Sequence, residues 1–521
     1  MLKLLNKNHW FFVFVIIGQM LVYNYPYILK LEPRTIHAWR QFDCLSFAQN
    51  FYNNNATLLS PALNNLGHTG NGKSVSEFPI VPMIIGNIWK ITGINSSIYK
   101  LANLIFLFLG LFYLYKLFIL ELNDKVVSTL LTGIIFTSPI LSYYGVSTIS
   151  DIQAFSFSIA GFYHFSSWLK NKKSNSLKTS VLLFLMAGLI KASSIILFTT
   201  CIIIYLIHEC RNVIELFNSK LKLQIAFLLA SPFFIWISWF LYARNYNLEN
   251  NSEFFLVGIL PIWDYDIAYI KSNFEKLFNN LLPELLNPAV FILLLIGLFY
   301  TLIYSDRKDH KLTISLCVLN FCGFIALFFG AMDVHDYYFI SPFILLIISL
   351  LFISKNWYEK VKLNYYPFLL FSLILILLVN SYLTGIKTWK KINDNVNDST
   401  DFMVFNEFQR KNNFWIYWLD REQFKTLEKM NIPMDKLGID KNQKIFCLGD
   451  FTINRSLYLI NRRGYSNFNV SIDKTPLFIN EHSDIKFVLL INHTLKKDSL
   501  LQPILRNKIY EEDNLSIYKV N

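Results

Sequence analysis

Long apolar blocks recur along this chain, and they constrain its fold more than any other feature. The clearest block is YPFLLFSLILILLVNSYLTGIK at 366–387, which is charged only at its last residue. A helix of about 20 apolar residues crosses the roughly 30 Å hydrocarbon core of a bilayer. Transmembrane β-strands would instead alternate polar and apolar residues over short segments. The chain is therefore predicted to be an all-α polytopic membrane protein.

The composition supports this class. Charged residues make up 16% of the 521 residues and hydrophobic ones 54%, whereas a soluble domain carries about 25% charged residues. The lysines and arginines that give the net charge of +12 lie between the apolar blocks. We therefore interpret them as a topology signal and expect no nucleic-acid partner. The six cysteines are scattered and show no metal-ligand spacing, so no disulfide framework is predicted.

About eleven transmembrane spans are expected from the block lengths. The first is interpreted as a retained helix and not as a cleaved signal peptide, because it is long and lacks a small-residue cleavage site. The fifth and sixth are joined at Lys191, where the chain is expected to turn just inside the interface. The expected spans lie near 10–29, 98–120, 126–143, 152–169, 179–190, 192–208, 223–243, 287–304, 312–331, 339–354 and 366–387.

Lysine and arginine concentrate in alternate connections, and this bias sets the topology of membrane proteins. The short loops around 144–151 and 332–338 carry no Lys or Arg, so they are assigned to the outer face. The N-terminus is then cytoplasmic and, with an odd number of spans, the C-terminus is outside. The basic residues of the cytoplasmic set are Lys3, Lys7, Lys170, Lys172, Lys173, Lys178, Arg211, Lys220, Lys222, Arg307, Lys308, Lys311, Lys355, Lys360 and Lys362.

Two regions outside the expected spans are predicted to face outward. The first outer loop, 30–97, contains an amphipathic segment at 43–54 and an apolar one at 78–93, which are predicted to be interfacial helices; the second could also be re-entrant. We place the membrane domain at 1–390 and a small outer α/β domain at 391–521. In that outer domain we expect a helix at 418–430 and strands at 444–450, 486–492 and 515–520.

The outer loops hold the residues that could carry chemistry. Asp43 opens the first interfacial helix, Glu77 precedes the second, and Asp151 stands where the fourth span leaves the outer face. MDVHDYYFISP at 332–342 lies at the mouth of the tenth span. An ionisable group at a span end is costly unless it is paired or wetted, and such groups are often functional. Their convergence at one face predicts a cleft for a polar, anionic ligand.

Each of these residues also has a structural interpretation. An aspartate at a helix start is more often an N-cap, and this explanation is favoured for Asp151 taken alone. His335 alone is more often a hydrogen-bonded interfacial histidine, and Tyr337 is an ordinary aromatic-belt residue. Lys191 and Arg244 could simply extend toward the interface. Only their convergence favours a functional explanation.

The first loop resembles a known family. HAWRQFD at 37–43, SFAQNFY at 46–52 and SEFPIVP at 76–82 are similar to the first loop of the GT-C superfamily of membrane glycosyltransferases. The closest branch is that of the bacterial relatives of protein O-mannosyltransferases and of the transferase that adds aminoarabinose to lipid A. HDYYFISP at 335–342 also resembles the aromatic-proline element that opens a late span there. The resemblance covers roughly residues 10–390 and implies interfacial helices in the first loop and a soluble outer C-terminal domain.

The resemblance implies roles for three acids. Asp43 matches the first-loop acid taken as catalytic, Asp151 matches the acid of the second outer loop, and Glu77 matches a glutamate implied to contact the sugar or a metal. Two positions depart from the aminoarabinose transferases, which have a basic residue after that glutamate, here Phe78, and an arginine one turn past the first acid, here Ser46. Both departures put the lipid-phosphate contacts in doubt and argue against aminoarabinose as the sugar.

An outward-facing transferase needs a donor carried by a lipid, because nucleotide sugars are cytoplasmic; the resemblance implies a polyprenyl-phosphate sugar. A carboxylate can stabilise the oxocarbenium-like transition state or take the proton of the acceptor hydroxyl. Cations would stabilise the leaving phosphate. The candidates for substrate binding are Arg40, Lys191 and Arg244 as cations, Tyr337 as a donor, and Glu77, His335 and Asp336 as further polar groups.

A divalent metal is left open as a cofactor. Glu77, His37, His335 and Asp336 are suitable ligands, but no fixed spacing supports a site.

The leading hypothesis is an inverting glycosyltransferase of the bacterial inner membrane, with Asp43 as the catalytic carboxylate and a lipid, glycan or protein as acceptor. One alternative is a transporter or flippase, although the sequence shows no internal repeat and its ionisable residues do not gather at mid-span. Another is a polysaccharide polymerase or ligase, which would use an oligosaccharide donor on a pyrophosphate carrier. For the outer C-terminal domain we favour acceptor positioning or stability over catalysis.

Overall fold

The computed structural model describes most of the chain in two compact units. The described residues are 9–209, 220–255, 258–333, 335–361, 365–393, 436–468, 470–512 and 515–520, with Phe424, Leu427 and Met434. Contacts group 1–29, 100–239 and 258–412 into the first unit, and 30–99, 240–257 and 413–521 into the second. Each unit is described by itself below.

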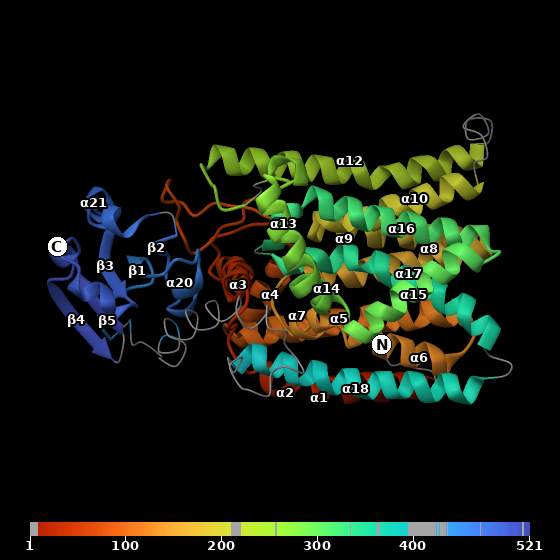
Figure 1. The fold of residues 1–521 in the computed structure, drawn as a ribbon. Helices are drawn as coiled ribbons and strands as arrows, with labels where there is room; N and C mark the ends of the chain where they lie inside the picture. Colours follow the sequence, from red (N-terminus) through yellow and green to blue (C-terminus); the bar gives the residue numbers. More distant parts are fainter. Residues whose placement is uncertain are drawn as a thin grey trace. The chain divides into compact units, whose positions relative to one another are not determined.

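The first unit is helical (Figure 1). All eleven apolar blocks expected from the sequence are occupied by helices, some of them broken into two pieces. The helices are α1 (Trp10–Val22), α2 (Tyr25–Ile28), α5 (Ser96–Leu122), α6 (Lys125–Phe136), α7 (Pro139–Tyr144), α8 (Asp151–Asn171), α9 (Ser174–Ile190), α10 (Ile195–Glu209), α12 (Lys220–Glu249), α13 (Ile267–Lys276), α14 (Leu282–Leu285), α15 (Pro288–Tyr304), α16 (Lys308–Leu327), α17 (Ile340–Val361) and α18 (Tyr366–Asn393). Short helical turns lie at η3 (Ala192–Ser194), η4 (Ile262–Asp264), η5 (Leu277–Leu281), η6 (Phe329–Asp333) and η7 (Asp336–Phe339).

Breaks in these helices have local causes. Asn24 adopts a left-handed conformation between α1 and α2, and Pro139 begins α7 where a proline needs no helical N–H partner. The chain turns at Lys191, which is extended between α9 and η3, as the sequence predicted. By length and composition, five helical segments in the described part could cross a membrane, or six if the pair 267–285 and 288–304, bent by 99°, is one span.

Polar groups inside the first unit tie its helices together at both ends. Gln19 of α1 donates to the carbonyl oxygen of Gly133 in α6 and to Oγ of Ser381 in α18. Lys170 and Lys355, from two of the basic connections, both pair with Glu121 at 2.8 and 2.7 Å. These two connections therefore lie at the same end of the unit, as the charge pattern predicted. Which side of the membrane this end faces stays a prediction.

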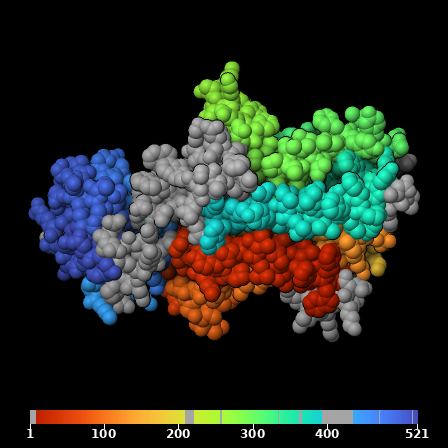
Figure 2. Space-filling model, turned by 60° about the horizontal axis from the view of Figure 1, so that its bottom comes forward, coloured from red at the N-terminus to blue at the C-terminus, as the bar shows by residue number. Residues whose placement is uncertain are grey.

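The outer flanks of α1 and α18 are apolar. The two helices lie side by side (Figures 1 and 2) and expose large hydrophobic side chains, among them Phe14 at 77% and Phe368 at 70%. Water would disfavour such a surface, whereas lipid would solvate it.

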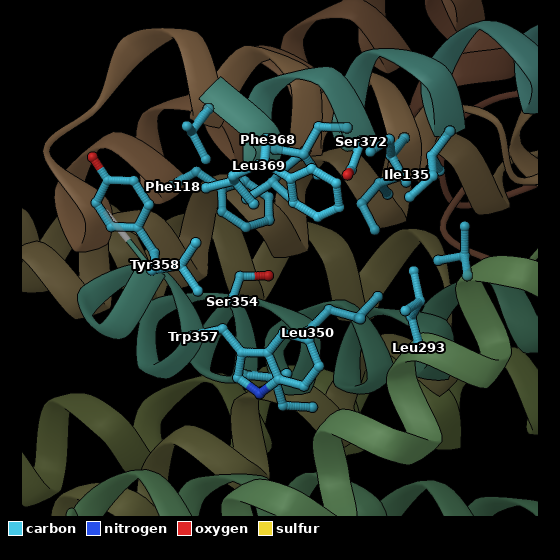
Figure 3. A pocket seen from close by; sticks show the side chains of 18 of the residues that line it. Phe118, Ile135, Leu293, Leu350, Ser354, Trp357, Tyr358, Phe368, Leu369 and Ser372 are labelled. Carbon is cyan, nitrogen blue, oxygen red and sulfur yellow. The ribbon is translucent and has the colours of Figure 1, made fainter. Parts of the chain in front are cut away.

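An apolar cavity of about 550 Å³ lies between α5, α6, α15, α17 and α18 (Figure 3). Its walls include Leu350, Trp357, Phe368 and Leu369, with the hydroxyl of Ser354 among its few polar groups. The cavity lies along the second half of α17, whereas the polar segment 335–339 stands directly before the start of that helix.

The second unit combines two loop helices with a small mixed sheet. Helix α3 (Ala38–Tyr52) packs on α4 (Ile80–Thr92), where Gly86 allows close approach because a Cβ would lie 2.5 Å from the carbonyl oxygen of Ala48. The sequence expected α3 to begin near Asp43; it begins at Ala38, so Asp43 is in its second turn and not at its start.

The sheet has the strand order β2-β1-β3-β5-β4. Strands β1, β2 and β3 are parallel, and β5 pairs antiparallel with β3 and β4. The strands are β1 (Lys444–Leu448), β2 (Gly464–Ser466), β3 (Ile485–Leu490), β4 (Asn507–Glu512) and β5 (Leu515–Lys519), with α20 (Arg455–Leu459), α21 (Thr475–Glu481), η9 (Ile472–Lys474), η10 (His493–Lys497) and η11 (Gln502–Ile504) between them.

Alternate side chains of β1 and β3 enter two different hydrophobic clusters, one on each face of the sheet. Burial on both faces explains why these strands are continuous apolar runs. The three expected strands are present, whereas β2 and β4 were not predicted because they are short or exposed. Most of the expected helix at 418–430 lies outside the described residues. The division at residue 390 stays a prediction; by contacts, the first loop groups with the C-terminal sheet.

Candidate active site

Asp43 lies on a face of α3 that is buried despite its polar residues. The Asp43 side chain is fully buried, and Arg40, Ser46 and Asn50 on the same helix are also buried. Buried polar side chains need partners, and here the partners come from the loop at 60–77 and from the turn that follows β1. All residues of α3 except Trp39 and Tyr52 are buried, so protein covers this helix on every face, and the expected amphipathic character is wrong.

The turn between β1 and α20 contacts the Asp43 carboxylate. Nδ2 of Asn454 donates to Oδ1 of Asp43 at 2.8 Å. The turn is shaped by Asp450, whose Oδ1 accepts from the backbone N–H of Thr452 and whose Oδ2 accepts from that of Ser456. These bonds place the start of α20 beside α3, so the end of a sheet strand becomes part of the Asp43 environment.

Arg40 joins the two acids of the first loop. Its Nη2 donates to both carboxylate oxygens of Glu77, at 2.8 and 2.7 Å, and its Nη1 lies 3.8 Å from Oδ2 of Asp43. The guanidinium also lies over the ring of Phe255, 5.2 Å from the centroid. A planar guanidinium suits such a two-sided contact. The structure thus brings Arg40, Asp43 and Glu77 together.

Burial raises the pKa of Asp43 to about 7, because the charged form loses its hydration. The nearby Arg40 and the hydrogen bond from Asn454 oppose this shift, whereas Glu77 and Asp450 add to it. Oδ2 of Asp43 is buried and has no hydrogen-bond partner among the described residues. A carboxylate with a pKa near 7 and one unused oxygen can accept a proton from a bound hydroxyl at neutral pH.

The second acid lies in the first unit and is paired with Lys191. Asp151 is the first residue of α8, after the N-cap Ser150, and its Oδ1 lies 3.2 Å from Nζ of Lys191. The helix boundary thus makes Ser150 the N-cap and Asp151 the first helical residue. Both side chains are buried, where a lysine and an aspartate are expected to pair.

The element at 335–339 surrounds the same lysine. Nζ of Lys191 lies over the rings of Tyr337 and Tyr338, 5.3 and 4.7 Å from their centroids, in the geometry of a cation–π contact. The ring of His335 stacks on Tyr338, and its Nδ1 is 3.2 Å from the Tyr337 hydroxyl. The convergence of these loops at one end, which the topology predicted, is thus present within the first unit.

Asp336 and the 144–149 loop complete this group. The Tyr144 hydroxyl donates to Oδ1 of Asp336 at 2.5 Å. Asn103 of α5 donates its side-chain amide to the carbonyl oxygens of Tyr144, Ser147 and Ile149. Asn103 therefore fixes the loop that leads into Asp151.

Arg244 and His37 are less closely tied to these groups. Arg244 of α12 is exposed, whereas Asp43, Asp151, Glu77, Lys191 and the 335–337 element are engaged as described. For a metal, the described residues contain no group of three or more His, Cys, Asp or Glu side chains that could hold an ion; His37 lies at the N-cap of α3 with its ring 6.2 Å from that of Trp39.

Sequence reasoning missed Asn454 and Asp450. Both lie in GDFTINR, directly after an apolar strand, and the ends of parallel strands are where functional groups commonly gather. That position was the only available signal, because the partner residue lies 411 positions away in the chain.

Comparison with known proteins supports the fold. No family model and no curated protein matches the chain. Among solved structures, ArnT from Cupriavidus metallidurans, bound to undecaprenyl phosphate, is similar over 98% of both chains, with a TM-score of 0.54 and 10% identity. An Archaeoglobus fulgidus oligosaccharyltransferase, in complex with Zn and sulfate, matches over 97% of this chain and 73% of its own, with a TM-score of 0.46 and 11% identity. The chain therefore shares the fold of ArnT over nearly its whole length, and it is a polytopic helical protein with a small C-terminal α/β domain, as the sequence predicted.

Proposed function

We propose that the protein is an integral membrane glycosyltransferase that moves a sugar from a polyprenyl-phosphate donor to an acceptor hydroxyl. The observation that carries the proposal is the buried Asp43 carboxylate, with its raised pKa and its second oxygen without a hydrogen-bond partner among the described residues. Support for the donor comes from the fold shared with ArnT, which was solved with undecaprenyl phosphate bound.

The proposed reaction is a single displacement at the anomeric carbon. The acceptor oxygen forms a bond to that carbon while the bond to the phosphate oxygen breaks, so the configuration inverts. The acceptor proton passes to Oδ2 of Asp43 and then to solvent, and polyprenyl phosphate leaves as the anion. A positioned base of this kind typically contributes about 10²–10⁴ in rate.

Two cationic groups have proposed roles. Arg40, held by Glu77 at 2.7–2.8 Å, keeps a positive charge next to Asp43, so the carboxylate can be ionised near neutral pH. Within the first unit, Lys191 is seated on the rings of Tyr337 and Tyr338 and stays a predicted contact for a lipid phosphate, since a compact ammonium stabilises negative charge. Asp151 would hold that lysine in place.

The proposed setting is the bacterial inner membrane, with a cytoplasmic N-terminus and the C-terminal domain on the outer face. The alternating distribution of lysine and arginine supports this orientation. The acceptor is a lipid, a glycan or a protein with a free hydroxyl.

The test is transfer by the full-length protein in sealed proteoliposomes, supplied with radiolabelled undecaprenyl-phosphate sugars one at a time together with a membrane extract as acceptor. We expect label to leave the carrier lipid with the wild type and not with Asp43→Asn. Asp473→Asn, which changes an exposed carboxylate in η9, is the matched control and should retain the wild-type rate. Undiminished turnover by Asp43→Asn would remove the catalytic role, and label that crosses the bilayer without forming a new glycosidic bond would favour a transporter.

A further inference from the structure

The side-chain amide of Asn454 has only one orientation that satisfies its neighbours. Its Oδ1 accepts from the backbone N–H of Asn65 at 3.1 Å and from the hydroxyl of Ser46 at 3.1 Å. A backbone N–H can only donate, so the amide atom that faces it must be the oxygen. The NH₂ group must then face the other way, where Oδ1 of Asp43 lies 2.8 Å from Nδ2.

The backbone that carries Asn454 is held as firmly as its side chain. The side-chain amide of Asn65 donates to the carbonyl oxygen of Ile453 at 3.0 Å and to Oγ of Ser466 at 3.1 Å. Asp450 binds the N–H groups of Thr452 and Ser456 on both sides of this position. Asn454 is fully buried, so solvent cannot replace its contacts.

The two oxygens of Asp43 therefore differ. Oδ1 is occupied by Asn454, and Oδ2 lies 3.8 Å from Arg40 with no hydrogen-bond partner among the described residues. A hydrogen bond to one oxygen fixes the rotation of the carboxylate about its side-chain torsion, and with it the direction of the other oxygen.

We propose that Asn454 is a positioning residue, which holds Oδ1 of Asp43 so that Oδ2 is presented to the acceptor hydroxyl. The C-terminal domain then completes the reactive group, a role different from the acceptor positioning or stability favoured from the sequence. The inference rests on the proposed function, because it gives Asp43 its task.

The first test is Asn454→Ala, measured with the donor lipids that the wild type uses. The variant lacks the Asn454 amide, whose hydrogen bond favours the charged form of the Asp43 carboxylate, so the pKa of Asp43 rises. We expect the acid limb of the kcat/KM profile to move up by about one pH unit, and the rate below it to fall about tenfold. The loss should appear in kcat more than in KM, since the interaction serves the reacting group.

The matched control is Asn467→Ala. Asn467 is also a buried asparagine of the C-terminal sheet region, and it bonds to the N–H of Gly449, to Val470 and to Thr475. None of these contacts reaches Asp43. We expect Asn467→Ala to lower thermal stability and to leave the acid limb at its wild-type pH.

A second variant gives a readout that does not depend on activity. Asn454→Asp keeps the shape of the side chain but turns the donor into a second carboxylate beside Asp43, and two adjacent carboxylates resist joint ionisation. We expect its resistance to unfolding in detergent to fall more steeply between about pH 5 and pH 8 than that of the wild type.

The outcomes separate the inference from the proposed function. If Asp43→Asn is inactive while Asn454→Ala keeps the wild-type acid limb and kcat, the positioning role is wrong and the transferase proposal stands. An equal shift of the acid limb in Asn467→Ala would also overturn the positioning role, because general loosening of the domain would explain it. If the wild type moves no label, the proposed function fails, and if Asp43→Asn is fully active, the catalytic role of Asp43 fails. In either case a wild-type pH slope in Asn454→Asp would refute the Asn454–Asp43 coupling itself.

Discussion

The raised pKa of Asp43 makes a quantitative prediction about stability. Its pKa increases from 3.8 to about 7 on folding, a change of about 3 units or roughly 4 kcal/mol of preference for the protonated form. Between these two values the folded protein binds more protons at this site than the unfolded chain does. The contribution of Asp43 to stability therefore falls as the pH rises through this range, and it is constant above about 7.

The measurement compares the wild type with Asp43→Asn. An asparagine carries no charge at any pH, so the variant lacks the cost of burying a carboxylate. From about pH 5 to pH 8 the stability advantage of the variant should grow by about 2–3 kcal/mol, since each pH unit below the folded pKa contributes about 1.4 kcal/mol. Other titrating groups are common to both proteins and cancel in the difference.

The assay is unfolding in mixed detergent micelles, followed by tryptophan fluorescence at several pH values. Asp473→Asn serves as the control, since that carboxylate is exposed and its replacement should leave the difference small. A stability difference between wild type and Asp43→Asn that does not change with pH would refute the reasoning. So would a difference that shrinks as the pH rises, because the sign would then indicate a carboxylate stabilised by folding.

Three further perturbations test other parts of the two units. Arg40→Gln removes the charge 3.8 Å from Asp43, so the acid limb of kcat/KM should move to higher pH by about a unit, and an unmoved limb would deny Arg40 this influence. Gly86→Ala should destabilise the protein by about 1–3 kcal/mol in a thermal-shift assay, since its Cβ meets Ala48 and Phe51 of α3. The control Gly323→Ala should be tolerated in that assay, because its Cβ meets nothing within 4 Å. Lys191→Gln breaks the buried pair with Asp151 and should lower stability by about 3–5 kcal/mol and reduce turnover. Lys191→Arg should recover part of the stability and of the turnover. Equal stability of the wild type and both variants would exclude a structural role for the pair.

Much of the fold was predictable because a membrane-spanning helix requires a continuous apolar segment, which is visible in the local sequence. Each expected apolar block is occupied by one helix or by two helical pieces, and the turn at Lys191 was marked by a charge within an apolar stretch. The start of α3 was placed five residues late, since His37 and Trp39 resemble loop residues but lie at or inside the helix. Strand β4 was missed because its side chains are exposed or half-buried, so no apolar alternation marks it.

The residues of the candidate site also differ in how far the sequence alone could identify them. Asp43, Glu77 and Arg40 lie in one loop, and their motif made them visible together. Asp151 and Lys191 were found by topology, which locates span ends but does not indicate ion pairs. Asn454 could not be found, because an asparagine in a turn is ordinary by composition and only the tertiary fold shows which carboxylate it faces.

The hydrogen bond between Asn454 and Asp43 joins residues 411 positions apart, and this separation has a consequence for biosynthesis. At roughly 5–20 residues per second, the ribosome needs on the order of 20–80 seconds after making residue 43 before residue 454 emerges. Asp43 spends that interval without its hydrogen-bond partner, although the helices that flank it in sequence can already insert. The proposed positioning of Asp43 by Asn454 can therefore be established only after residue 454 has been translated.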